Sequence, residues 1–599
     1  MAPSASCFDF MCISRVQMCH FKTISGCCFD MIRYTKSSLT IDTGCLKCSA
    51  NIHKLRDLLY AYGAPTPPLL PLNSNRCSDF TFIFVLFFHV CFCLCLYAGV
   101  LEKTVEREAA ALTKAKTLYK SCINESLIEL RGGAPLLDML PDIFEWPMAV
   151  DNWEDDYGKT WRLEDVIARL NEKYGTQLLV NFFVGTDDRD STSYIIHETL
   201  LVLVKRLLLT NVLQACRAYE QFMFDLAKLI RSDRGLDINE THIREEVTRV
   251  VDLERDIANA TDTPEDRNNP VLLYNKMELG ELNRNFTLEI DSQKFNWSYF
   301  TAKIMDTVNI SVPESEKIIN YSPNYYRRLN FVLAKYTKRD LQNYMVWRFA
   351  MNMVVGMSRA YRDTRKAFRK ALSGTTSEVA VWRQCALYVN NNLDKAVGRL
   401  YVQEAFSEKS KELMEEMIKD IREVFISNLN DLAWMDEETK KAAEEKARAI
   451  RERIGYSEDI MDDKYLNNEY KDVSIFLCNR KYFRKVAFLI VLENSTIGLH
   501  CNPENDQKSA YKDFVKQHGE EPTLPGIDLS HDQLFFLNFA QIWCGSHRPE
   551  QAVNSIKVDV HSPGMFRVLG SLQNFPEFAK AFNCNKSSNM VSDNICRVW

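Results

Sequence analysis

Residues 407–455 read SEKSKELMEEMIKDIREVFISNLNDLAWMDEETKKAAEEKARAIRERIG, and this stretch decides the fold class. The spacing of apolar residues over 408–429 predicts an amphipathic helix with one face packed inward. Asp436 can cap a further helix that Gly455 ends. Glu437–Lys441 and Glu444–Arg448 lie one turn apart on the solvent face of that helix. We therefore predict a mainly α protein. The apolar positions of the first helix are Leu413, Met414, Met417, Ile418, Ile421, Val424, Phe425 and Leu429.

The composition agrees with a folded protein of several domains. The 599 residues suffice for about four domains of ~150 residues each. A hydrophobic content of 46% with 26% charged residues excludes disorder as the main state. The net charge of −6 argues against nucleic-acid binding, because nucleic-acid binders carry a basic surplus. The short apolar run at 178–184 is compatible with a strand, and no internal repeat is present.

One segment predicts a membrane anchor. Residues 80–100, FTFIFVLFFHVCFCLCLYAGV, carry no formal charge and are long enough as a helix to span a hydrocarbon core of about 30 Å. The segment lies too far from Met1 to be an ordinary signal peptide, so we predict an uncleaved signal anchor. Residues 1–79 before it are predicted to be a poorly ordered leader. Their single pair Cys45 and Cys48 is weak evidence for zinc.

Nine N-x-S/T sequons follow the anchor, and their number on one side favours a lumenal or extracellular location for that side. Lys103, Arg107, Lys114 and Lys116 favour the opposite orientation by the positive-inside rule, so the two signals conflict. We base the prediction of an extracellular C-terminal part on the sequons. They are Asn124, Asn239, Asn259, Asn285, Asn296, Asn309, Asn320, Asn494 and Asn585.

Several runs identify a family resemblance. They include YKSCINES, FFVGTDD, NNPVLLYNKMELGEL, FRKALSGTTSE and VDVHSPGMFR. Over about 115–195, 210–475 and 507–599 the chain resembles the neprilysin/endothelin-converting-enzyme family of zinc metalloendopeptidases. The resemblance implies a single-pass type II plasma-membrane protein with an extracellular, mainly helical, two-lobed ectodomain, a zinc cofactor and peptide substrates. It implies a helical N-terminal domain at 101–487, an aberrant junction at 488–506 and a remnant of the truncated metallopeptidase domain at 507–599.

The zinc-binding part of the family pattern is missing. Family members carry H-E-x-x-H on a helix, where two histidines one turn apart bind zinc and the glutamate is the general base. None of the ten histidines here has a second histidine four residues later, and His197-Glu198 continues with Thr-Leu-Leu. The third-ligand helix is also absent, although Glu493-Asn494 echoes it, and His500 and His518 fit no common helical face. We expect the printed chain to bind no zinc and to lack zinc-dependent peptidase activity.

Two site residues remain by resemblance, both in VDVHSPGMFR. His561 would stabilise the oxyanion of the tetrahedral intermediate, and Arg567 would hydrogen-bond a substrate carbonyl. His561 can also merely cap the turn before Pro563. Without zinc, these residues are relics or parts of a peptide-binding surface.

The resemblance also pairs Cys122 with Cys385. It would pair Cys544, Cys584 and Cys596 with cysteines in family segments that this chain lacks, and ETLLVLVKRLLLTNVL at 198–213 replaces the family sequence before Cys216. Three readings are compared, and the last of them is favoured for this exact chain. The chain is an active membrane peptidase, a non-catalytic ectodomain that binds peptides or a protein, or an incompletely assembled reading frame of a true peptidase.

Overall fold

The computed structural model describes residues 98–199, 213–473 and 527–595 apart from isolated positions, and a few residues between 515 and 523. The leader 1–79, nearly all of the anchor segment 80–100 and the junction 488–506 lie outside the described residues, so these assignments stay predictions. Among the described helices, none combines the length and the apolar character that crossing a bilayer requires.

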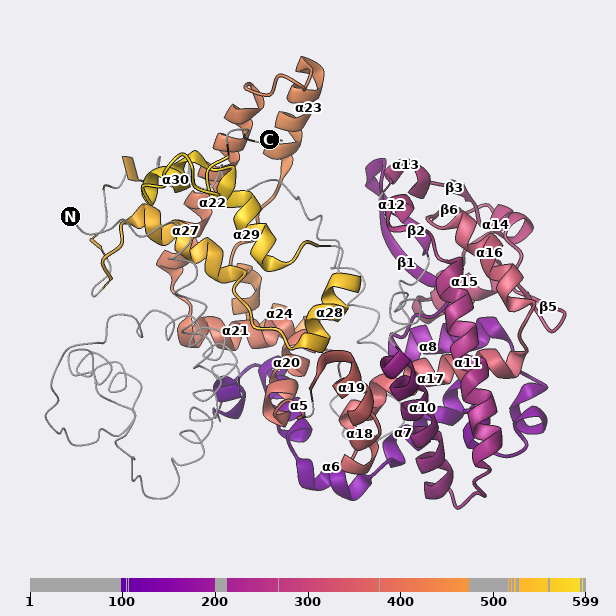
Figure 1. Ribbon diagram of the computed structural model, residues 1–599. Helices are drawn as coiled ribbons and strands as arrows, with labels where there is room; N and C mark the ends of the chain where they lie inside the picture. Colours follow the sequence, from indigo (N-terminus) through magenta and orange to yellow (C-terminus); the bar gives the residue numbers. More distant parts are fainter. Residues whose placement is uncertain are drawn as a thin grey trace, which may run out of the picture.

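Helices dominate the described residues, as the sequence predicts (Figure 1). Those before residue 355 are α5 (Ala110–Cys122), α6 (Glu125–Arg131), α7 (Ala134–Met139), α8 (Leu163–Tyr174), α10 (Leu213–Asp233), α11 (Glu240–Ala260), α12 (Pro264–Arg267), α13 (Pro270–Leu273), α14 (Leu279–Asn285), α15 (Trp297–Met305), α16 (Pro323–Leu333) and α17 (Lys338–Met353). Those after it are α18 (Arg359–Thr364), α19 (Lys366–Ser373), α20 (Val381–Asn392), α21 (Asp394–Ala405), α22 (Glu408–Leu429), α23 (Glu437–Ala449), α24 (Asp463–Glu469), α27 (His531–Ile542), α28 (Pro549–Val558), α29 (Gly564–Gln573) and α30 (Pro576–Ala581).

A small mixed sheet accompanies the helices. Its strand order is β1-β2-β6-β3, with β1 and β2 forming an antiparallel hairpin and β6 lying parallel to β2. Residues 181–184 of the apolar run at 178–184 therefore lie in a strand, as their character allows. The strands of this sheet are β1 (Asn181–Asp187), β2 (Asp190–Thr199), β3 (Lys276–Glu278) and β6 (Lys317–Asn320), and β4 (Glu289–Ile290) pairs separately with β5 (Gln293–Lys294).

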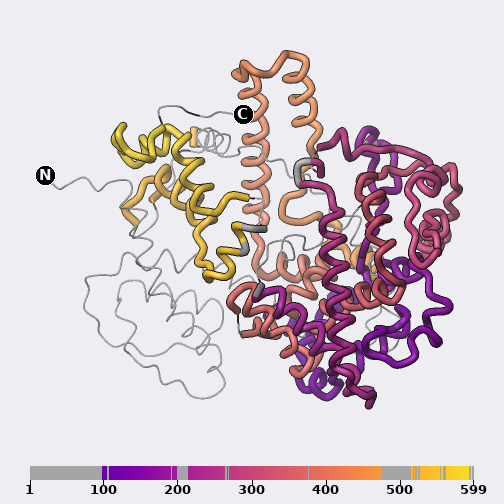
Figure 2. The backbone as a smooth tube through the Cα atoms, turned by 45° about the vertical axis from the view of Figure 1, so that its right-hand side comes forward, coloured from indigo at the N-terminus to yellow at the C-terminus, as the bar shows by residue number. Residues whose placement is uncertain are grey.

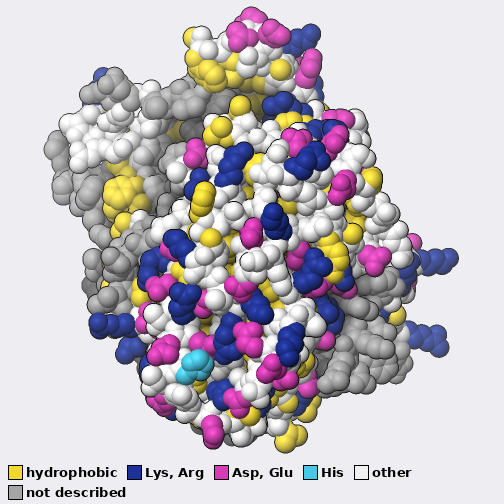
Figure 3. Space-filling view, turned by 90° about the vertical axis from the view of Figure 1, so that its right-hand side faces the viewer, with side chains coloured by type: hydrophobic (Ala, Val, Ile, Leu, Met, Phe, Trp, Pro, Cys, Tyr) yellow, Lys and Arg dark blue, Asp and Glu magenta, His cyan; other side chains and the backbone are white. Residues whose placement is uncertain are grey.

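The largest core lies among α8, α10, α11 and α14–α17, beside this sheet. Trp347 of α17 is fully buried, and its indole N–H donates to the Tyr219 hydroxyl at 2.7 Å. That hydroxyl donates to Glu254 Oε1 at 3.0 Å, so a chain of two hydrogen bonds links three buried side chains. A capping box between Thr337 and Asp340 begins α17. On the face in Figure 3, positive and negative side chains intermix without a basic stripe, as expected of ion-paired helix surfaces.

A second core joins two distant parts of the chain. Helix α5 packs against α20, α21 and α24, and Tyr119, Val389 and Leu466 are buried among them. This group therefore brackets the large core in sequence, with one member before it and three after it.

The α22–α23 hairpin projects from the molecule in both backbone views (Figures 1 and 2). Helix α22 spans the predicted residues, but its apolar face is covered only in part, because Leu429 is buried while Ile418, Ile421, Val424 and Phe425 are half-buried. Leu413 and Met414 are 41% and 42% exposed, and hydrophobic side chains are visible on the hairpin at the top of Figure 3. The first half of the apolar face, at Leu413, Met414 and Met417, is thus exposed.

Helix α23 begins where the sequence predicts and ends earlier. The Asp436 side chain accepts the Thr439 N–H at 2.8 Å, which confirms the cap. Glu444 pairs with Arg448 at 3.0 Å as predicted, whereas Glu437 pairs with Lys440 rather than Lys441. The helix stops at Ala449 and not at Gly455, because Ile450 adopts an extended conformation.

Candidate functional site: the segment around His561 and Arg567

Helices α27, α29 and α30 hold the segment that carries both residues expected to act in the family. They pack around Phe536, Val568, Leu572 and Phe578, whereas α28 packs against α19. A capping box begins α27, where the Ser530 hydroxyl accepts the Gln533 N–H at 3.2 Å. This small core fixes α29 and thereby the residues at its start.

Arg567 is held by its own segment and by an aromatic ring. Its Nε donates to the Ser562 carbonyl at 3.0 Å, and its guanidinium carbon lies 4.4 Å from the centroid of the Trp543 ring. A cation in this position is attracted to the negative face of the ring. A Cβ added at Gly564 would lie 2.7 Å from the Trp543 carbonyl oxygen, so the backbone of α29 approaches α27 as closely as glycine permits. The sequence alone did not identify Trp543 as the contact of Arg567. The one signal for it in the sequence was its position directly after the segment that becomes α27.

His561 lies at the other end of the same turn. Its side chain is exposed, and it is followed by Ser562 and Pro563, which lead into α29. His561 and Arg567 are six positions apart in the sequence and so share one short segment, and the roles that the resemblance gives them stay predictions. Both groups can donate hydrogen bonds to a carbonyl or an oxyanion. Neither can supply the nucleophile that peptide hydrolysis needs.

The His197-Glu198 pair lies in strand β2 and not on a helix. Successive side chains of a strand point to opposite faces, so the two cannot act at one centre. The His197 ring stacks on Phe183 at 4.6 Å and on Tyr321 at 5.1 Å, and its Nε2 lies 3.2 Å from the Thr186 carbonyl oxygen. Burial lowers the pKa of His197. Glu198 is fully buried, and neither of its carboxylate oxygens has a hydrogen-bond partner among the described residues.

The described residues do not fit a zinc centre. Within them, no three His, Cys, Asp or Glu side chains are placed to hold a metal ion. Of the ten histidines, His197, His242, His531, His547 and His561 lie in the described part. Glu493, His500 and His518 lie outside it.

The predicted Cys122–Cys385 disulfide is confirmed. It joins α5 to α20, with a Cα–Cα distance of 5.7 Å across a sequence separation of 263 residues. Cys584 is disulfide-bonded as well, although the resemblance left it without its family partner. Its partner cysteine is not among the described residues.

The sequons occupy different environments. Asn494 lies outside the described residues, and seven others are exposed: Asn124, Asn239, Asn259, Asn285, Asn296, Asn309 and Asn585. Asn320 is the exception, because its side chain is buried at the end of β6 and accepts the Ser322 N–H at 2.9 Å. A glycan on Asn320 does not fit this fold.

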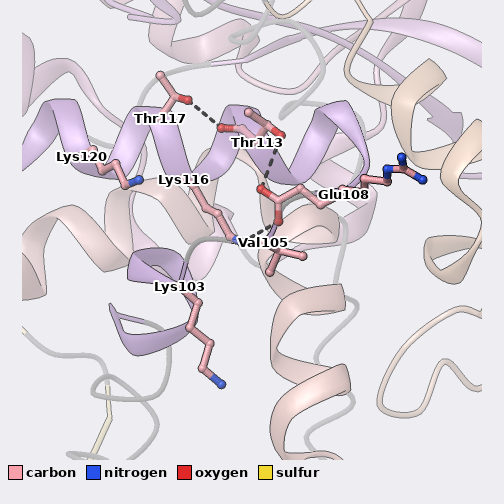
Figure 4. Close-up of a pocket in the computed structure, with 8 residues that line it drawn as sticks. Lys103, Val105, Glu108, Thr113, Lys116, Thr117 and Lys120 are labelled. Carbon is pink, nitrogen blue, oxygen red and sulfur yellow. Dashed lines mark hydrogen bonds and ion pairs between the residues drawn. The ribbon is translucent and has the colours of Figure 1, made fainter.

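A cavity of about 570 Å³ lies beside α5 and contains several basic side chains (Figure 4). Lys116 turns to Glu108 and pairs with it at 2.5 Å, while Lys103 points away and pairs with Glu404 at 2.5 Å. The cations do not converge on one point, so the cavity is not a built anion site.

Comparison with known proteins adds the identity of the fold. Two sequence models of peptidase family M13 match residues 97–457 and 494–598. Neprilysin of Mus musculus is 43% identical over 630 residues, which cover 84% of each chain. Membrane metallo-endopeptidase-like 1 of Homo sapiens is 33% identical over 632 residues, covering 84% of this chain and 81% of the relative.

Solved structures agree at the level of the fold. Zinc metalloprotease Zmp1 of Mycobacterium tuberculosis has a TM-score of 0.61 at 16% identity, over 89% of this chain and 95% of that one. PepO of Lactobacillus rhamnosis HN001 has a TM-score of 0.58 at 15% identity, over 90% and 97%. The sequence matches extend through most of the chain, and the chain therefore belongs to peptidase family M13.

Proposed function

We propose that this chain is a membrane-anchored, extracellular member of its family that cannot hydrolyse peptides in the printed form. The observation that carries the proposal is the absence of any two histidines one helical turn apart in the full sequence. Zinc hydrolysis needs three protein ligands, an open position for water and a base that takes the proton of that water. His561 and Arg567 can only assist an attack that other groups begin.

The alignment with a relative supports a missing catalytic segment. It runs over 630 residues but uses 84% of this chain, which is about 500 residues, so about 125 positions of neprilysin have no counterpart here. The exposed apolar face of α22 supports the same proposal, because a face of this kind is normally covered by a neighbouring element. An incompletely assembled reading frame explains both observations. Sequencing of full-length transcripts across residues 488–508 tests whether the reading frame is incompletely assembled. Transcripts that encode the printed sequence without an inserted segment there would contradict it.

The activity test uses the full chain in detergent beside mouse neprilysin as the positive control. Bound zinc is measured by elemental analysis, and cleavage of a broad peptide substrate is measured with and without a chelator. We expect less than stoichiometric zinc and no chelator-sensitive cleavage from this chain. Stoichiometric zinc together with chelator-sensitive cleavage would overturn the proposal.

One observation favours a second function, the binding of peptides without cleavage. Arg567 is fixed by Ser562 and Trp543, so its remaining guanidinium nitrogens are oriented for an acceptor such as a peptide carbonyl. Arg567→Lys keeps the positive charge and loses the planar set of guanidinium N–H donors. If this surface binds peptides, the Lys variant should bind a labelled peptide library more weakly than the original chain.

The membrane topology rests on residues 80–100 and on the sequons that follow them. In secretory cells the chain should fractionate with membranes and lose mass when N-glycans are removed. A soluble product whose mass does not change would refute a single-pass type II protein at the plasma membrane.

A further inference from the structure

A groove with a volume of about 460 Å³ lies on the large α/β part of the molecule, between α13 and the facing ends of α14 and α16. This volume is within the range of about 300–1,000 Å³ found for sites that hold small organic ligands. Val271 and Leu272 of α13 form an apolar rim and are 73% and 50% exposed. These two adjacent aliphatic side chains give the groove an apolar edge against which an occupant can pack.

The other side of the groove is polar. The Arg327 guanidinium lies 4.9 Å from the centroid of the Phe286 ring, which forms part of the lining. Asn275 and Asn324 add amide groups, and Asp266 adds a carboxylate. Asn275 Nδ2 donates to the Leu272 and Asn320 carbonyls, and Asn324 Oδ1 accepts from Arg327 at 3.0 Å, which leaves the Asn275 oxygen and the Asn324 amino group for an occupant. An occupant must therefore combine an apolar face with many hydroxyl or amide groups.

Asn285 belongs to the wall of this groove. It is the last residue of α14, its side chain is exposed, and its Nδ2 lies 3.3 Å from Glu281 Oε1, which also lines the groove. Asn285-Phe286-Thr287 is one of the sequons. A glycan linked to Asn285 would therefore begin inside the groove.

We propose that the N-linked glycan of Asn285 lies in this groove, with its first N-acetylhexosamine residues against Val271 and Leu272. Each such sugar has a carbon–hydrogen face and an acetyl methyl group for the apolar rim, and hydroxyl and amide groups for Arg327 and the asparagines. A covalent link also gives an effective concentration in the millimolar range for short flexible tethers, so weak contacts are sufficient. The proposal rests on the extracellular topology proposed above.

Asn309 supplies a matched control. It is exposed at the end of a 3-10 turn, carries the sequon Asn309-Ile310-Ser311, and lines neither of the two cavities described above. A glycan on Asn309 should therefore extend into solvent. Differences between the two sites report the groove and not glycosylation in general.

The test compares full-length protein from secretory cells with the variants Asn285→Gln, Thr287→Val and Asn309→Gln. Thr287→Val removes the glycan but keeps Asn285, which separates the loss of the sugar from the loss of the side chain. Hydrogen–deuterium exchange is followed at short times in residues 271–277. We expect several-fold faster exchange there in both groove variants and no change in Asn309→Gln. We also expect an endoglycosidase to release the Asn285 glycan from the native protein several-fold more slowly than the Asn309 glycan.

A second pair of variants tests the apolar contact. Leu272→Ser should make the Asn285 glycan as easily released as that of Asn309, whereas Leu130→Ser, at a residue 83% exposed on α6, should not. Unchanged exchange in Asn285→Gln and Thr287→Val, or equal release from both asparagines, would overturn the proposal. Glycans elsewhere but none on Asn285 would overturn it and leave the topology intact. Absence of all glycans would overturn both.

Discussion

Glu198 is a carboxylate placed where folding disfavours its charge. Its side chain is fully buried, and the described residues offer no hydrogen bond to either oxygen. Burial raises the pKa of Glu198 well above its ordinary value. The folded protein therefore keeps this proton at a pH where the unfolded chain has released it. Stability falls as the pH rises above about 4.3, where the unfolded group ionises.

Glu198→Gln should raise the free energy of unfolding at pH 7 by about 1–3 kcal/mol, because a neutral amide folds without the proton uptake that the glutamate needs at this pH. At pH 4 the substitution should change little, since the glutamate is then largely protonated in both states. Denaturant unfolding at both pH values measures the difference. Glu246→Gln is the control, because Glu246 is paired with Arg339 and its loss should destabilise at pH 7. Equal destabilisation by both substitutions would refute the role given to Glu198.

Two glycines of α29 make opposite predictions. Gly564→Ala would place a Cβ 2.7 Å from the Trp543 carbonyl oxygen, whereas a Cβ at Gly570 meets nothing within 4 Å. The first change should destabilise α27–α30 by about 1–3 kcal/mol through overpacking. The second should stabilise by about 0.5–1 kcal/mol, because alanine restricts the unfolded chain more. The rate of proteolysis within residues 530–590 distinguishes them, and similar rates would contradict the close approach.

At the level of helices and strands, the sequence predicts contacts between near neighbours in the chain but not contacts between distant segments. The cap at Asp436 and the pair Glu444–Arg448 depend on neighbours within four residues, so the sequence alone specifies them. The parallel pairing of β2 with β6 joins Ile196 to Ile318 across 122 positions, and no local pattern encodes it. The placement of Trp543 under Arg567 likewise depends on the packing of α27 against α29.

The α22–α23 hairpin allows a test of its open face. Leu413→Glu and Met417→Glu lie on exposed positions, so each should change hairpin stability by no more than about 0.5 kcal/mol and should reduce binding of a hydrophobic dye. Phe425→Glu is the contrasting variant, because Phe425 packs against Leu429, Leu432 and Met435. It should open the hairpin to hydrogen exchange. If the first two variants destabilise as strongly as the third, the face is covered in solution.

For the whole molecule, the Cys122–Cys385 bond closes a loop of 263 residues of separation. The chain-entropy model gives about 5 kcal/mol as an upper figure for such a loop. Cys122→Ser, Cys385→Ser and the double variant should all lower the denaturation midpoint by the same amount, since each breaks the same bond. Peptide mapping without reductant provides the independent check. Two free thiols in the original chain would contradict the linkage.

The fold of the whole molecule also determines which sequons can carry a glycan. Mass spectrometry of tryptic glycopeptides should find glycans among the seven exposed asparagines and an unmodified Asn320, because that side chain is buried at the end of β6. Asn320→Gln should lower stability by about 1–3 kcal/mol, since the longer side chain disrupts the bond to Ser322. A modified Asn320 in correctly folded protein would contradict the burial.

The disulfide between α5 and α20 also constrains the order of events during biosynthesis. Synthesis at about 5–20 residues per second separates the appearance of Cys122 and Cys385 by about 13–50 seconds. Cys216 appears during that interval, and it is the only cysteine between them in the sequence. Cys122 of α5 can therefore form its native bond only after all residues of the large core have been synthesised. Correct pairing therefore depends on early folding of that core, which must separate Cys122 from Cys216 until Cys385 is available.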